Sequence, residues 1–319
     1  MADGKEHLRG IQIAMNTSDL VASLRLFSDF GFHNAGGRMI WGKSMAIQGL
    51  KPDARGTMWW LVGRQRFVQL ELFNHSNPKQ RPLPDDWRCS DLGWTRFGFS
   101  VPNLDAVRQT LDDWGIEIAG QGVDADGTKR LVFRDPFVGT FAEAFEEGAG
   151  VPGGAKPRYH DLDPAIVYAT SSVSDLDEAR KYYSDILGLQ IVQDIVIHEP
   201  EHEQFFGLSG ARSESFVVDT GSFLLEIVRY FDPSGRRKPG HHSIVDQGLM
   251  NIALAALDDQ QFAEDAIERI GKAGIRMTPR SRFGGTYVIE PDREIEICGN
   301  PPDFESNFGF VPADPFSGG

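Results

Sequence analysis

The sequence repeats itself, and this repeat constrains the fold more than any other feature. The tripeptide Ser18-Asp19-Leu20 recurs 156 residues later as Ser174-Asp175-Leu176, and Asp91-Leu92-Gly93 recurs 155 residues later as Asp246-Gln247-Gly248. Each half divides again into two units of one order: a strand, an amphipathic helix that ends at glycine, and further strands that lead to a glutamate. This fourfold pattern predicts four copies of a βαβββ unit.

The spacing of apolar residues predicts the elements of each unit. Residues 11–16 alternate between apolar and mostly polar, as expected of a strand with one face on a core and the other free to line a pocket. Apolar residues at helical spacing predict four helices, over 20–30, 104–114, 176–187 and 262–273, each followed by glycine. The expected fold class is α+β, with the four units paired into two domains whose curved antiparallel sheets are covered by helices.

Length and local composition predict two domains. A chain of 319 residues with 40% hydrophobic content can bury two cores of about 155 residues each. The segment 147–164 contains four glycines and three prolines without an apolar period, which is typical of a linker. We therefore expect an N-terminal domain over 1–150, a linker over 151–162 and a C-terminal domain over 163–319.

Charge and composition exclude several classes of partner. A net charge of -14 argues against binding to nucleic acid, whose partners concentrate Lys and Arg. The polar N-terminus lacks the apolar run of a signal peptide, and no stretch reaches the ~18 apolar residues of a membrane span. Only Cys89 and Cys298 are present, so a disulfide framework is not expected. We expect a cytoplasmic protein with a small-molecule partner and no membrane contact; a homodimer is compatible with the sequence.

Four segments resemble the vicinal oxygen chelate superfamily, which includes glyoxalase I, extradiol dioxygenases, bleomycin resistance proteins and methylmalonyl-CoA epimerase. These segments are FRDPFVGTFAEAFE at 133–146, YYSDILGL at 182–189, LLEIVRYFDPSG at 224–235 and DQGLMNIAL at 246–254. The resemblance implies that paired units curl into cups, and that first and last strands supply inward residues to a divalent metal. The first-strand positions correspond to Gln12, Arg96, Tyr168 and Asn251, and the last-strand positions to Glu71, Glu143, Glu226 and Glu296.

None of these eight positions is a histidine, which departs from the family pattern. In the first domain, Gln12, Glu71 and Glu143 come close to the Gln, two Glu and one His of glyoxalase I, but Arg96 replaces the histidine. Because an arginine does not ligate metals, we expect Arg96 to neutralise Glu71 or Glu143, or to bind a substrate carboxylate. These four residues and Trp60 are the expected substrate-binding residues.

In the second domain the expected catalytic residues are Tyr168, Glu226, Asn251 and Glu296. A buried glutamate can move a proton near neutral pH, and a tyrosine can hydrogen-bond a developing enolate. His242, in the loop before the fourth unit, is a further candidate base, with a solvated surface histidine as the alternative. The degenerate metal positions are Gln12, Glu71 and Glu143, or Glu226, Asn251 and Glu296; we favour no metal, with a hard divalent cation as the alternative.

A second histidine pattern has a different interpretation. Residues 198–202, His-Glu-Pro-Glu-His, match the letters of a zinc-protease motif, which requires one continuous helix. Because Pro200 disfavours that helix, we interpret the segment as a polar connection.

The resemblance implies an enzyme, which we expect to act on a hydrophobic or aromatic oxygenated small molecule by proton transfer, as an isomerase or lyase. The alternatives are an extradiol-type ring-cleaving dioxygenase and a non-catalytic binding protein of the bleomycin-resistance type.

Overall fold

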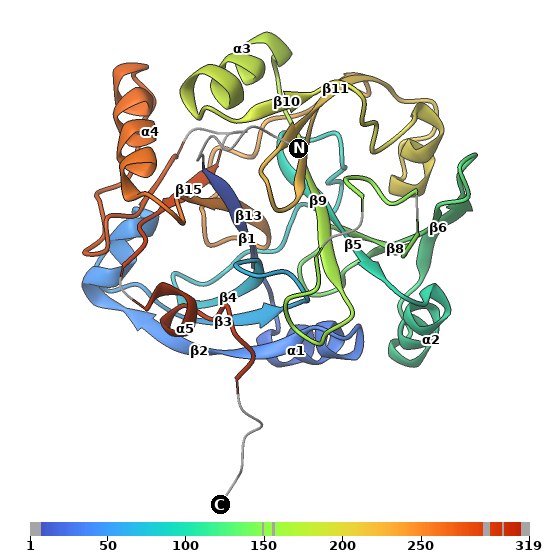
Figure 1. Cartoon of the computed structure of the whole chain (residues 1–319), viewed down its shortest axis with the longest axis horizontal. Helices are drawn as coiled ribbons and strands as arrows, with labels where there is room; N and C mark the ends of the chain where they lie inside the picture. The colour runs from blue at the N-terminus through green and yellow to red at the C-terminus, as the bar shows by residue number, and fades with distance from the viewer. Residues whose placement is uncertain (1–7, 149, 155–156, 290–293, 302, 314–319) are drawn as a thin grey trace, which may run out of the picture.

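The computed structural model describes residues 8–148, 150–154, 157–289, 294–301 and 303–313. Its two sheets and peripheral helices confirm the α+β class (Figure 1). The first three units have the predicted βαβββ order, and the fourth has two strands after its helix among the described residues. Within the described residues the longest helix has 13 residues, and no helix has the length and hydrophobicity of a membrane span.

The elements follow the order of the four units. The first unit comprises β1 (Arg9–Asn16), α1 (Leu20–Asp29), β2 (His33–Trp41), the 3-10 helix η1 (Gly42–Gln48), β3 (Arg55–Val62) and β4 (Gln69–Asn77). The second comprises β5 (Gly93–Val101), α2 (Leu104–Trp114), β6 (Ile118–Val123), β7 (Lys129–Arg134) and β8 (Phe141–Glu146). The third comprises β9 (Ala165–Ser172), α3 (Leu176–Lys181) with the π-helical turn η2 (Tyr182–Ile186), β10 (Gln190–Val192), the 3-10 helix η3 (Pro200–Phe206), β11 (Arg212–Asp219) and β12 (Leu224–Asp232). The fourth comprises β13 (Gly248–Ala255), α4 (Gln260–Lys272), β14 (Thr286–Tyr287) and β15 (Ile295–Cys298), and the short helix α5 (Phe304–Asn307) follows.

The units do not pair in the expected way. One sheet has the order β14-β15-β13-β1-β4-β3-β2 and the other β10-β11-β12-β9-β5-β8-β7-β6. The first unit therefore shares a sheet with the fourth, through β1 and β13, and the second with the third, through β5 and β9. We call the concave face of the first sheet cup A and that of the second cup B. The expected pairing of neighbouring units within 1–150 and within 163–319 is wrong. Both sheets are also mixed rather than antiparallel, because the first and last strands of each unit run parallel.

Two crossing loops explain this pairing. The β4–β5 loop passes from the first sheet to the second, and the β12–β13 loop passes back. Arg81 of the first loop forms an ion pair with Asp246 of the second at 2.7 Å, and Arg236 of the second forms one with Asp91 of the first at 2.7 Å. The partners are related by the repeat, because 81 to 236 and 91 to 246 are both 155 residues. The two halves thus hold each other through reciprocal copies of one contact.

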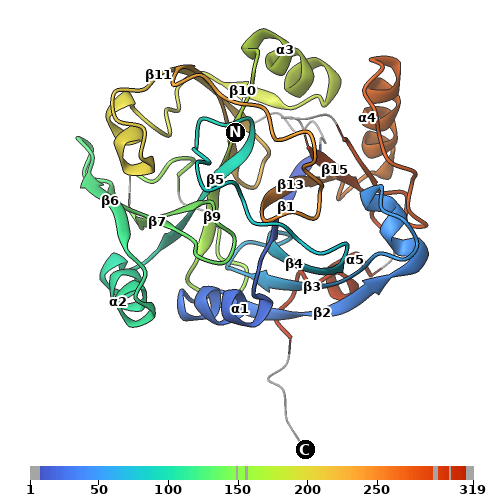
Figure 2. The ribbon, with the colours of Figure 1, turned by 180° about the vertical axis from the view of Figure 1, so that it is seen from behind.

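The alternation of apolar and polar residues along a strand determines which side chains face the core and which face a cup. In β1, Ile13 and Met15 belong to the main apolar core, which also takes in Leu26 and Phe27 of α1. Gln12 faces the opposite side, towards cup A. The helices lie at the periphery of the molecule, as the view from behind shows (Figure 2). Each sheet therefore packs one face against helices and leaves its concave face for polar side chains.

Candidate functional site

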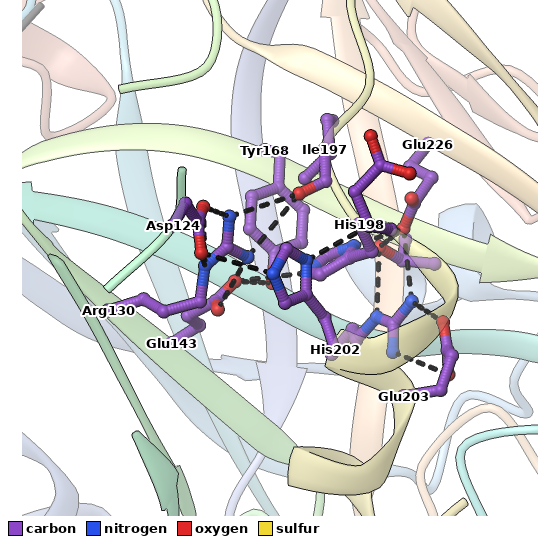
Figure 3. Close-up of polar contacts among 12 residues, drawn as sticks. Asp124, Arg130, Glu143, Tyr168, Ile197, His198, His202, Glu203 and Glu226 are labelled. Atoms are coloured by element: carbon purple, nitrogen blue, oxygen red, sulfur yellow. Dashed lines mark hydrogen bonds and ion pairs between the residues drawn. The ribbon is translucent and has the colours of Figure 1, made fainter. Parts of the chain in front are cut away.

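Cup B contains a dense network of ion pairs (Figure 3). Glu143 on β8 and Glu226 on β12, two of the expected ligand positions, face each other across the sheet. The imidazole of His198, from the connection after β10, lies between them: Nε2 is 3.0 Å from Glu143 Oε2 and Nδ1 is 2.8 Å from Glu226 Oε2. Tyr168 on β9 donates its hydroxyl hydrogen to Glu143 at 2.7 Å, and Thr170 donates to Glu226 at 2.7 Å.

His198 is an imidazolium. Two carboxylates can only accept, so both ring nitrogens must donate. Burial and the charge of Arg96 disfavour this state, but Glu226 and Glu143 outweigh them and raise the pKa of His198. Burial likewise works against ionisation of Glu143, yet His198 and Arg130 lower its pKa to about 2. The pKa of Glu226 is lowered for the same reason, by His198 and Arg96.

Arg96 completes the network, but with partners other than those expected. Its guanidinium forms two hydrogen bonds with Glu203 of η3, at 2.9 and 3.2 Å, and one with Glu226 at 3.2 Å. The expectation that it neutralises Glu71 or Glu143 is wrong, because Glu71 belongs to the other sheet and Arg130 pairs with Glu143. Three cations in cup B, Arg96, Arg130 and His198, thus pair with three glutamates, and Arg130 also pairs with Asp124. Since every carboxylate is partnered, cup B is filled by its own charges.

Cup A has the remaining four positions and a different chemistry. Gln12 of β1, Glu71 of β4, Asn251 of β13 and Glu296 of β15 are all buried, and Glu296 is the most exposed at 9%. Trp60 of β3 donates its indole hydrogen to Glu71 Oε1 at 2.9 Å. Neither Glu71 nor Glu296 forms an ion pair within the described part of the chain.

The two carboxyl groups of cup A therefore have raised pKa values. Burial, together with the charge of Glu296, raises the pKa of Glu71 to about 8, against the opposing hydrogen bond from Trp60. Burial raises the pKa of Glu296 to about 7. The two cups thus shift the pKa of the same residue type in opposite directions, because the glutamates of cup B form close ion pairs, whereas in cup A burial outweighs the more distant charge of Arg38 on Glu71.

A chain of amides ends on the Glu71 carboxyl. The carbonyl oxygens of Phe308 and Gly309 lie 3.0 and 2.6 Å from the Gln69 amide, and because carbonyls only accept, the Gln69 nitrogen must donate to them. The Gln69 oxygen then accepts from the Gln12 amide at 2.8 Å, so the Gln12 oxygen faces Glu71. The 2.5 Å between this Gln12 atom and Glu71 Oε2 suits an O–H···O hydrogen bond better than an N–H···O hydrogen bond. The protonated form of Glu71, which its raised pKa favours near neutral pH, can donate to this oxygen.

Cup A fits a hard divalent cation. The amide chain directs the Gln12 oxygen at the Glu71 carboxyl. A cation could take the place of the proton between these two groups. The Asn251 amide is 1% exposed, and neither its oxygen nor its nitrogen has a hydrogen-bond partner of normal geometry in the described structure. With Glu296, these residues offer two carboxylates and two amide oxygens, which suit magnesium or manganese. The described residues contain no cluster of three or more His, Cys, Asp or Glu side chains with metal-binding geometry.

The expected metal sets are regrouped by the sheet pairing. Glu143 lies in cup B, away from Gln12 and Glu71, and Glu226 is likewise separated from Asn251 and Glu296. Neither of the two expected sets is assembled.

A cavity of about 610 Å³ lies between the crossing loops, beside cup A. Trp94, Leu249 and Met250 are part of its wall, and Met250 also packs in the apolar cluster of cup A. His242 lines this cavity rather than either cup. Burial and the charge of Lys238 lower the pKa of His242 to about 4, so the imidazole is neutral near neutral pH.

Comparison with known proteins agrees with this geometry. Residues 165–296 match the sequence profile of the Glyoxalase/Bleomycin resistance protein/Dioxygenase superfamily. The likeness in sequence to this superfamily lies in residues 165–296. Glyoxalase I from Zea mays superposes with a TM-score of 0.60 at 14% identity, covering 92% of each chain. A candidate dioxygenase from Bacillus subtilis gives 0.59 at 15% identity, covering 94% of this chain and 88% of the other. At such identities the superfamily likeness concerns the fold. No curated protein sequence matches the chain significantly.

The sequence analysis missed the residues that fill cup B from outside the ligand positions, chiefly His198 and Glu203. The segment 198–202 was interpreted only as a polar connection, but Glu199 and His202 form a reciprocal cap at the start of η3 with Pro200 in its first turn. The available signal was the pattern of a helix start at 199–202. It lies in a connection to which the repeat assigns no element.

Proposed function

We propose that cup A is the active site of an isomerase or lyase that moves a proton on an oxygenated apolar small molecule, with a divalent cation bound by Gln12, Glu71, Asn251 and Glu296. The observation that carries this proposal is the contrast between the cups. Cup B balances its acids with His198 and two arginines, whereas the two buried carboxyls of cup A form no ion pair within the described residues. Uncompensated buried acids are costly, so their retention points to a function.

In such a site the cation would act as a Lewis acid on a substrate oxygen. Gln12, held by Gln69, fixes its oxygen inside the cup. Glu296 would accept a proton from a carbon next to a carbonyl group and return it to a neighbouring carbon. Trp60 holds the Glu71 carboxyl in place through its indole hydrogen bond. The phenol of Tyr287 donates a hydrogen bond to Glu296, which lowers the pKa of this carboxyl against the effect of burial.

The test is titration of chelator-treated protein with Mn²⁺, followed by electron paramagnetic resonance. We expect one site per chain in the wild type and at least a tenfold weaker affinity in Glu71→Gln and Glu296→Gln, because each variant removes one of two charged ligands. The exposed Glu214→Gln on β11 is the matched control and should bind as the wild type does. Equal Mn²⁺ binding by all four proteins would refute the site.

The second candidate is a binding protein without catalysis. The 610 Å³ cavity favours it, because its size suits a small ligand and its wall combines tryptophans with aliphatic side chains. Binding of apolar compounds that is unaffected by Glu296→Gln and by Mn²⁺ would support this alternative. The extradiol alternative has less support, because no two histidines occupy the ligand positions of either cup.

A further inference from the structure

Arg38 lies on β2, the edge strand of the first sheet, and its side chain is exposed beside cup A. It pairs in register with Met58 of β3, which packs in the apolar cluster of cup A. Its guanidinium carbon lies 5.1 Å from the centroid of the Trp60 ring and 5.2 Å from that of Phe308. The cation is therefore held between two aromatic faces on the same side of the sheet as Glu71, to which Trp60 is hydrogen-bonded.

This guanidinium has no carboxylate partner among the described residues. The arginines of cup B and of the crossing loops, by contrast, each form close ion pairs. Glu71 lies within electrostatic reach of Arg38, but so does a second cation, Arg282. The hydrogen-bond donors of Arg38 are thus available to a ligand.

The charge of the occupied cup identifies the ligand. A divalent cation cancels the charges of Glu71 and Glu296, and Arg38 then leaves the cup with an uncompensated positive charge, with Arg282 as a second cation within electrostatic reach. The ligand that balances this charge is an anion. A guanidinium also matches the two oxygens of a carboxylate. Phe283, in edge contact with Phe308 at 5.4 Å and 38% exposed, extends the aromatic surface beside this position.

We infer that Arg38 anchors the carboxylate of the substrate, so that cup A accepts the anion of an apolar or aromatic acid whose remaining oxygen reaches the glutamates. This inference rests on the proposed function, because it assumes that cup A is the occupied site.

The experiment is calorimetric titration of the full-length, Mn²⁺-treated protein with mandelate, an aromatic 2-hydroxy acid, and with its neutral counterpart mandelamide. We expect mandelate to bind about tenfold or more tightly than mandelamide. Arg38→Gln should remove that preference, and Arg38→Lys should retain part of it. Arg25→Gln is the matched control, because Arg25 also lies over a tryptophan ring, that of Trp114, but away from the cup.

Two results would overturn the inference: mandelate binding that is unchanged in Arg38→Gln, and no binding of mandelate to Mn²⁺-loaded wild type. Mn²⁺ binding, measured separately, distinguishes this failure from failure of the proposed function. If the wild type binds no Mn²⁺ but still prefers mandelate in an Arg38-dependent way, the cation site is wrong and the carboxylate anchor stands. Loss of Mn²⁺ binding in Arg38→Gln would instead show that Arg38 maintains the cup, and would contradict its role as an anchor.

Discussion

Replacing Glu71 by Gln should make the metal-free protein more stable at alkaline pH. A buried acid with a raised pKa favours the folded state while it is protonated. Its stabilising effect is complete below the unfolded pKa and is lost as pH rises towards the folded pKa. For Glu71 this window extends from 4.5 to about 8. Gln has the same size and cannot ionise, so it removes this dependence.

The magnitude follows from the width of that window. One pKa unit corresponds to about 1.4 kcal/mol, so ionising Glu71 in the folded protein costs about 5 kcal/mol at most. Allowing for water entry into the cup, we expect Glu71→Gln to exceed the wild type by about 2 to 4 kcal/mol at pH 8.5. At pH 5.5, one unit above the unfolded pKa, the wild type has lost only about 1.4 kcal/mol, so most of this advantage should be absent.

The assay is urea denaturation in the presence of a chelator at pH 5.5, 7.0 and 8.5, with Glu214→Gln as the control. The difference between Glu71→Gln and the wild type should grow with pH, while the control stays flat. Adding Mn²⁺ should reverse the order at pH 8.5, because the ion binds the deprotonated carboxylate of the wild type. A difference that does not change with pH would refute the reasoning.

Three further outcomes follow from the structure. His198→Gln should destabilise the protein by about 3 to 5 kcal/mol at pH 6, because it leaves two buried glutamates without their shared cation; since the pKa of His198 is raised, the loss should shrink as pH rises through that folded pKa, as urea denaturation at several pH values would show. Arg81→Gln should cost about 1 to 2 kcal/mol, because Asp246 is buried and loses its ion pair; an unchanged urea midpoint would contradict this. Gly309→Ala should displace the C-terminal segment, because a Cβ atom there would meet the Trp60 ring at 2.5 Å and φ is +72°; iodide quenching of tryptophan fluorescence should increase.

The elements could be predicted from local pattern, and the eight positions that face the cups from the repeat together with the family resemblance. Alternation in β1 placed Gln12 opposite Ile13, and the repeat then placed Glu71 and Glu226 at equivalent strand positions. Each of these predictions depends on residues within one unit, where period and spacing determine which face a side chain occupies.

The partners of these residues could not be predicted in the same way. Pairing of β1 with β13 joins residues about 240 positions apart, and equivalent units offer equivalent strand edges, so local pattern does not distinguish the pairings. The reciprocal contacts of Arg81 and Arg236 favour the observed pairing of units. These residues lie in loops, where strand and helix periodicity gives no information. His198 escaped for a related reason, because its role arises only when its connection folds over cup B.

The most direct test of the central claim, that cup A and not cup B is the functional site, is the Mn²⁺ stoichiometry of the chelator-treated protein. Elemental mass spectrometry after dialysis should give about one ion per chain for the wild type and Glu214→Gln, and well below one for the double variant Glu71→Gln/Glu296→Gln. A double variant that retains one tightly bound ion would place the cation outside cup A and contradict the account.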